Sequence, residues 1–166
     1  MADIKQAFGT AFTFTVTNAN LANSATAGWK SNARDNSSNK FTDCLVHVRL
    51  AAVNTAPANS RAIFLYAYGL ADESGSNYTS SGDGTPDGNE GTMTFPDVTA
   101  NAIPLPLLGV VPYPVQNKAI NGGPFSVAKC FGGVLPSKWG IAMVNHSGMT
   151  LSVAAIEGRE IYNTVA

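Results

Sequence analysis

The sequence is poor in charge, in cysteine and in long apolar runs, and each shortage narrows what the protein can be. Charged residues make up 13% of the 166 residues, about half of the usual quarter. The net charge is -1, so nothing predicts binding to nucleic acid or to an acidic membrane. Two cysteines exclude a disulfide scaffold. Membrane-helix and signal-peptide patterns are missing, so we expect a soluble protein made in a cytoplasm.

What the sequence does contain is a large share of small, uncharged side chains. Hydrophobic residues account for 45% of the chain, enough for one domain of this length to bury a core without metal or disulfides. We expect a single domain over residues 1–166, preceded by an extended arm at about residues 1–9. A surface with so little charge favours association with other protein.

Alternation of apolar and polar residues dominates the chain, which predicts β-strands. In residues 10–17, TAFTFTVT, every second residue is apolar; residues 41–53 alternate in the same way. The expected strands, about eight in all, are residues 10–17, 41–53, 61–70, 105–111, 125–131, 139–145, 150–156 and 160–165. We therefore predict an all-β fold, a single antiparallel β-sandwich of jelly-roll or related type with long loops.

The segments between these strands are rich in glycine, proline, asparagine, aspartate and serine, as turns require. Residues 145–150 are short enough for a hairpin, with Gly148 at a positive φ. Residues 71–92 contain almost nothing that could join a core, so we expect an exposed excursion there.

Candidates for catalysis are few. The chain has two histidines, His47 and His146, and neither lies in a recognisable serine, cysteine or carboxylate motif. Cys44 and Cys130 lie inside apolar strands, where cysteine packs as a small hydrophobic residue; a disulfide between them is the alternative. We expect no enzymatic activity and no cofactor.

One segment supports a weak calcium hypothesis. Residues 83–90, DGTPDGNE, match the first half of a calcium loop, but Thr94 stands where the closing glutamate should be. The candidate ligands are Asp83, Asp87, Asn89 and Glu90. A solvated turn is the alternative, and we expect no metal.

Four apolar residues beside loops are candidates for contacts with other subunits: Ile4, Phe8, Trp29 and Tyr113. Each is an apolar side chain in or next to a segment without core alternation. The alternative for each is ordinary core packing. Trp29 and Tyr113, together with Trp139, could instead form a platform for stacking a sugar ring.

Several stretches resemble a group of small structural proteins of tailed bacteriophages. The stretches are residues 4–31, residues 35–50 with 61–72, and residues 123–152; the most specific is PFSVAKCFGGVLPSKWGIAMVNHSG, residues 124–148. Members of this group are virion proteins, so the resemblance implies a particle component and carries over no catalytic residue.

Two functions remain open at this point. The first is a decoration or cement protein that binds the major capsid protein on the outer surface of the capsid, as a homo-oligomer and preferably a trimer. The second is a tail, neck or fibre component that binds a host receptor or carbohydrate. A charge near zero disfavours a position against packaged DNA, and scattered aromatic residues disfavour a sugar groove, so we expect the first.

Overall fold

The computed structural model describes residues 3–16, 20–39, 41–58, 61–72, 77–98 and 103–165. Parts of three expected features lie outside the described residues: residues 1–2 of the arm, residue 17 of the first strand and residues 73–76 of the excursion. Strands take up 51% of the chain and helix 3%. In chain order the elements are β1 (Ile4–Thr13), β2 (Asn20–Leu21), β3 (Ala27–Lys30), β4 (Arg34–Asp35), β5 (Asp43–Leu50), β6 (Ala62–Gly69), β7 (Gly91–Thr94), β8 (Leu107–Pro112), β9 (Ile120–Ser126), the 3-10 helix η2 (Ala128–Phe131), β10 (Lys138–His146) and β11 (Leu151–Val165). In these ranges no helix is long and apolar enough to cross a membrane.

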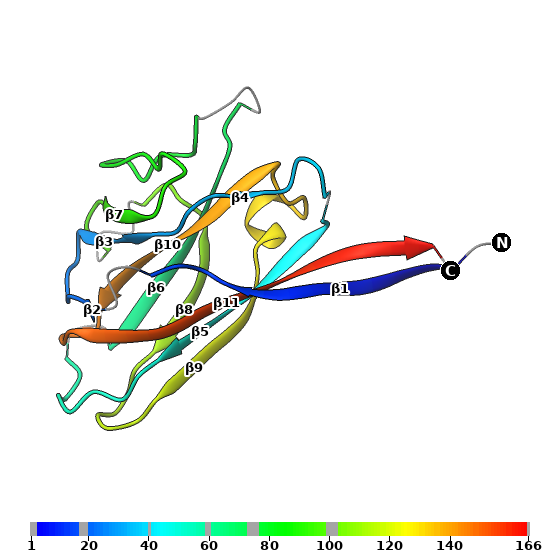
Figure 1. The fold of residues 1–166 in the computed structure, drawn as a ribbon. Helices are drawn as coiled ribbons and strands as arrows, with labels where there is room; N and C mark the ends of the chain where they lie inside the picture. The colour runs from blue at the N-terminus through cyan, green and yellow to red at the C-terminus, as the bar shows by residue number, and fades with distance from the viewer. Residues whose placement is uncertain are drawn as a thin grey trace.

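Two antiparallel sheets pack against each other (Figure 1). The first sheet has the order β1-β11-β5-β9, with β2 against β11; the second has the order β7-β3-β10-β6-β8, with β4 against β10. Without the small strands β2, β4 and β7, renumbering the strands in chain order gives 1-8-3-6 and 2-7-4-5, the strand order of a jelly-roll. The expected sandwich is confirmed, with eleven strands in the described ranges rather than about eight.

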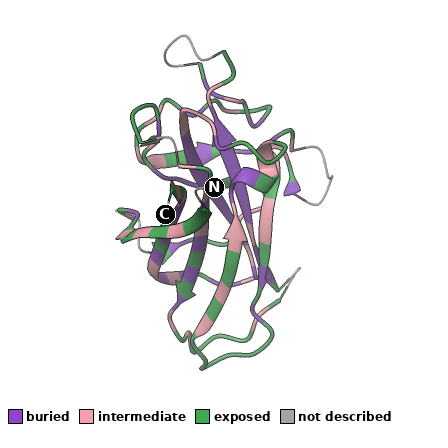
Figure 2. Cartoon of the chain, turned by 90° about the vertical axis from the view of Figure 1, so that its right-hand side faces the viewer, coloured by how far each residue is buried: buried purple, intermediate pink, exposed green. Residues whose placement is uncertain are grey.

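The main core lies between the sheets, and burial alternates along β5, whereas β6 and β10 are buried over almost their whole length (Figure 2). In β5 the inward side chains are at most 1% exposed, whereas His47 and Arg49 face solvent. Those inward residues are Cys44, Val46, Val48 and Leu50. In β10, Ile141 and Met143 are fully buried. The core face predicted for residues 41–53 is therefore confirmed, whereas residues 139–145 of β10 are buried on both faces.

A second apolar cluster covers the outer face of the second sheet. Tyr78 and Phe95, both buried, join Tyr68 of β6 in this cluster, and the rings of Tyr68 and Tyr78 meet edge to face at 5.5 Å. Within residues 71–92, Tyr78 joins this core cluster, which was not expected, whereas most of the other described residues are exposed or half-buried as expected. The apolar residues of this range are too widely spaced among glycine, serine and aspartate to form a periodic pattern.

The expected strand at residues 125–131 is also wrong. This range contains the end of β9 followed by η2, and β9 itself begins at Ile120. The glycines of β9 read as a turn in the sequence, but Gly122 allows close packing against β8. A Cβ atom on Gly122 would lie 2.3 Å from Cγ2 of Val111, so a larger residue would not fit in the strand there.

The turn at residues 145–150 differs from the expected hairpin. Gly148 has the positive φ predicted for it, +83°. However, β10 belongs to the second sheet and β11 to the first. The short connection therefore crosses between the two sheets, as jelly-roll topology requires, instead of joining two paired strands.

Candidate functional site

A two-stranded ribbon projects from one end of the sandwich (Figure 1). It consists of residues 4–8 of β1 and residues 161–165 of β11, paired from Ile4 opposite Val165 to Phe8 opposite Ile161. Strand β5 pairs with β11 as far as Ile161. Along residues 162–165, no third strand of the described chain joins the ribbon, and a two-stranded unit of this kind is marginal by itself.

One face of the ribbon exposes apolar side chains. Directly opposed residues share a face of the sheet, so Ile4, Phe8 and Val165 lie on the same side. Their exposed fractions are 75%, 50% and 75%, whereas residues at alternating positions of β5 and β10 are buried. The ribbon therefore has no second layer over these apolar side chains, which makes this face a candidate contact surface.

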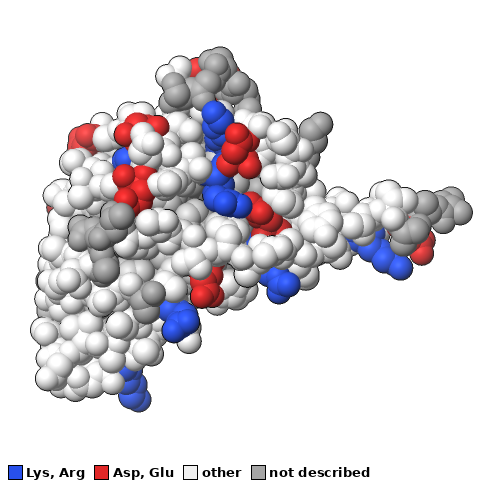
Figure 3. Space-filling view, viewed as in Figure 1, with Lys and Arg blue, Asp and Glu red and all other residues white. Residues whose placement is uncertain are grey.

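The ribbon carries little charge. Residues 3–8 and 161–165 contain one acid, Asp3, and one base, Lys5. In the space-filling view the projecting part is white over most of its length, with its charged atoms toward the free end (Figure 3). Protein, rather than nucleic acid, is the partner that such a surface fits.

The base of the ribbon contains an irregularity held by an arginine. The register between β1 and β11 shifts between Phe8 and Ala11, and such bulges bend a strand and increase its twist. Arg159 Nε donates to the carbonyl oxygen of Gly9 at 3.1 Å, and its guanidinium lies 5.4 Å from the centre of the Phe8 ring. Arg159 therefore fixes the point at which the ribbon leaves the sandwich.

An ion pair between a buried glutamate and a partly exposed arginine lies on the inner side of this base. Arg34 Nη2 is 2.9 Å from Oε1 of Glu160, whose side chain is 8% exposed. The Arg34 guanidinium also lies 3.9 Å from the centre of the Phe12 ring. These contacts join β4 and β1 to β11, so they tie both sheets to the strand that continues into the ribbon.

The four residues proposed from sequence as subunit contacts divide into two pairs. Ile4 and Phe8 lie on the exposed face of the ribbon. Trp29 and Tyr113, by contrast, are 0% exposed, and their core-packing alternative is correct. The Trp29 indole N–H donates to Glu90 Oε1 at 2.6 Å, so its ring offers no platform for a sugar.

Tyr113 is held in the core by polar contacts of its hydroxyl. This hydroxyl donates to the carbonyl oxygen of Lys118 at 2.8 Å and accepts from the backbone N–H of Val53 at 3.1 Å. The residue thus fastens two loops to the end of β8. An apolar segment beside a loop looks the same in sequence whether its aromatic ring is inside or outside.

The calcium candidates serve other contacts. Lys30 Nζ donates to Asp87 Oδ1 and to the carbonyl oxygen of Asn89, both at 2.7 Å, and Glu90 accepts from Trp29. The hydrogen bond from Lys30 lowers the pKa of Asp87 to about 2. Across the described ranges, no three histidine, cysteine, aspartate or glutamate side chains gather as a metal site would require. Asp83 lies exposed in the same segment.

The cysteines and histidines form no metal-type cluster in the part of the chain that the structure describes. Cys44 and Cys130 are both thiols and do not form the alternative disulfide. Burial raises the pKa of the Cys44 thiol to about 12 and also raises that of Cys130, so neither is a ready nucleophile at neutral pH. His47 lies on β5 in the first sheet, and His146 ends β10 in the second.

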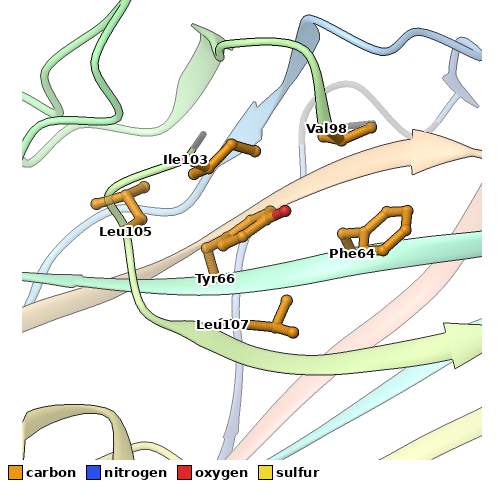
Figure 4. A pocket seen from close by; sticks show the side chains of 6 residues that line it. All are labelled: Phe64, Tyr66, Val98, Ile103, Leu105 and Leu107. Carbon is orange, nitrogen blue, oxygen red and sulfur yellow. The ribbon is translucent and has the colours of Figure 1, made fainter. Parts of the chain in front are cut away.

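A hollow of about 300 Å³ opens on the outer face of the second sheet (Figure 4). The side chains that line it are apolar apart from one tyrosine hydroxyl: Phe64, Tyr66, Val98, Ile103, Leu105 and Leu107. Burial raises the pKa of Tyr66, so this hydroxyl stays protonated. The hollow suits an apolar contact, and its lining side chains supply no acid and base pair.

Comparison with known proteins adds no relative. A scan against protein-family models finds no match, and no curated protein matches the chain significantly. Sequence reasoning identified Ile4 and Phe8 but missed Val165, although residues 161–165 alternate in the same way; nothing local indicates that the two ends of the chain pair.

Proposed function

We propose that this protein is a non-enzymatic structural component of a bacteriophage particle, and specifically a decoration or cement protein on the outer surface of the capsid. The observation that carries the proposal is the projecting ribbon with its uncovered apolar residues Ile4, Phe8 and Val165. The core of the sandwich is complete without these three side chains, so packing within the chain does not explain their exposure. A neighbouring protein subunit that covers it would bury apolar surface at little electrostatic cost.

The major capsid protein is the partner that we propose for this face. A shell under the pressure of packaged DNA gains stability when a small rigid domain bridges adjacent subunits. The ribbon is tied to both sheets through Arg34, Glu160 and Arg159, so a force on it is transmitted to the whole sandwich. The near-neutral surface favours the exterior of the shell over its DNA-facing interior.

The experiment compares particles that carry the wild-type chain with particles that carry the Ile4→Ser, Phe8→Ser variant. We expect the variant to fold normally but to bind the shell at least tenfold more weakly, and its particles to release DNA at a lower temperature. Val134→Ser is the matched control, because Val134 is 71% exposed but lies outside the ribbon. Its particles should behave as wild type.

Two results would overturn the proposal. Particles with and without the protein could resist heat equally, which would remove the cement role. Alternatively, imaging of the intact particle could locate the chain on the tail, neck or fibre; the receptor-binding or carbohydrate-binding alternative would then replace it.

A further inference from the structure

The ribbon has two outer edges, one along β1 and one along β11, and the unpaired edge along β1 is the longer of the two. Strand β1 is the last strand of its sheet, and no described residue pairs with its outer side. Backbone N–H and C=O groups along such an edge are ready to pair with another chain. The corresponding edge of β11 is shorter, because β5 covers it as far as Ile161.

We propose that two copies of this chain pair through this edge, β1 against β1, antiparallel about a two-fold axis at Gln6. The inference deepens the proposed function, because it names the partner of the ribbon's edge and leaves the apolar face for the shell. The product is a four-stranded sheet, β11-β1-β1-β11, that joins two sandwiches. An interface of this kind is self-complementary and closed, as most homodimers are.

The side chains select this register. With Gln6 on the axis, Ile4 lies opposite the partner's Phe8 and Lys5 lies opposite the partner's Ala7. Apolar residues then face apolar residues, and no like charges stand directly opposite each other. Cross-strand pairs of this type stabilise a sheet by a few tenths to about 1 kcal/mol each.

Neighbouring registers of the β1–β1 pair place less compatible side chains opposite each other. An axis at Lys5 sets the two lysines directly against each other, which is destabilising. An axis at Ala7 places Phe8 against the partner's Gln6. An axis between two residues joins the apolar face of one copy to the opposite face of the other, because side chains alternate with a period of two.

The shape of the molecule permits this pairing. Both chain ends lie at the free end of the ribbon, away from the sandwich (Figure 1). In an antiparallel pair the two sandwiches therefore leave in opposite directions, each beginning at the bulge after Phe8. Four residue steps of extended strand, about 14 Å, separate Ile4 from Phe8 and leave room for the partner's ribbon.

The paired ribbons also explain the placement of the exposed apolar residues. Ile4, Phe8 and Val165 from each copy come together on one face of the four-stranded sheet, which doubles the patch available to the shell. The pairing itself buries less than the roughly 1,200 Å² of a standard interface. We expect the dimer to depend on concentration in solution and to be held in place on the particle. The trimer expected from sequence cannot use this edge for all three copies.

Disulfide trapping tests the register directly on the full-length chain. In a Cys130→Ser background, Gln6→Cys should form a covalent dimer under mild oxidation, because residues opposite on the axis have Cα atoms within the 4.4–6.8 Å that a disulfide spans. Ala7→Cys is the matched control. The proposed register offsets its two copies by two residues, or about 8 Å, so it should cross-link at least tenfold less.

The double variant Lys5→Cys, Ala7→Cys should restore cross-linking, since these positions face each other across the axis. Equal yields from Gln6→Cys and Ala7→Cys would overturn the register, as would a trimeric mass of the wild-type chain in light scattering at rising concentration. A monomeric mass with no cross-linking would overturn the pairing altogether. The particle experiment stands apart from this one, so the cement role could survive the loss of the dimer.

Discussion

The ribbon and the inter-sheet core are both built from strands with apolar residues at alternating positions. They differ in whether another layer of protein packs over those residues. Ile141 in β10 and Ile4 in β1 both occupy apolar positions of an alternating strand, yet Ile141 is 0% exposed and Ile4 is 75% exposed. The difference is the facing layer: the first sheet packs over Ile141 in β10, whereas no second layer packs over the ribbon. Alternation therefore indicates which face of a strand is apolar. It does not indicate whether another part of the same chain packs over that face.

The largest expected loss of stability follows from a substitution in the inter-sheet core. Ile141→Ala removes methyl and methylene groups from the centre of the core and should lower the free energy of unfolding by about 2 to 5 kcal/mol. Urea unfolding followed by tryptophan fluorescence measures this, since Trp29 and Trp139 are both fully buried. Val134→Ala, at an exposed position, should stay within about 0.5 kcal/mol. Similar losses for the two variants would contradict the assignment of the core.

The next effect probes the junction between the two regions. Arg34→Ala leaves the Glu160 carboxylate buried without its partner. Because the Arg34 side chain is 37% exposed, we reduce the usual cost of breaking a buried pair to about 2 kcal/mol. Arg49→Ala removes the same charge from the exposed face of β5 and is the control. The expectation fails if the two variants unfold at the same urea concentration.

Sequence patterns predicted the body of the fold well where strands alternate strictly. In β5, Cys44 and Val46 lie on the core face that period two assigns to them, whereas β10 is buried on both faces. Strict alternation works in β5 because this strand packs one face on the core and exposes much of the other. The predicted sandwich class followed from these strands.

The predictions that were wrong have a common physical cause. The contacts that determine these parts of the structure join residues that are far apart in the sequence. Glycines in β9 look like a turn until the side chains of β8 fill the space above them. Trp29 looks exposed until Glu90, 61 residues away, accepts its hydrogen bond. Likewise, nothing near Ile4 indicates that Val165 is its partner.

A smaller effect concerns the layer formed by residues 77–98, which is fastened by Lys30 and Asp87. Because the folded-state pKa of Asp87 is about 2, below its ordinary 3.8, the pair stabilises the fold above pH 4. This stabilisation is lost as the pH falls from about 4 to about 2. The Asp87 side chain is 62% exposed, so screening limits the contribution to less than about 1 kcal/mol.

Thermal melting of wild type and Asp87→Asn at several pH values tests this contribution. The wild type should melt higher at pH 6, and the difference should shrink toward pH 2. Asp83→Asn makes the same charge change in the same segment and should show a smaller difference at pH 6. A wild-type advantage that persists unchanged at pH 2 would show that the ion pair is not its source.

The smallest expected change in stability follows from a substitution on the exposed face of the ribbon. Ile4→Ala is the same substitution as Ile141→Ala, but at a residue that is already 75% exposed, so the free energy of unfolding should change by less than about 0.5 kcal/mol. Its effect should appear in association instead, because Ile4 faces the partner's Phe8 in the proposed pair and belongs to the face proposed for the shell. Light scattering should show a higher concentration for half-dimerisation, and fewer copies should remain on washed particles. If Ile4→Ala instead destabilises the isolated chain as much as Ile141→Ala does, the ribbon is part of the folding core and not a contact surface.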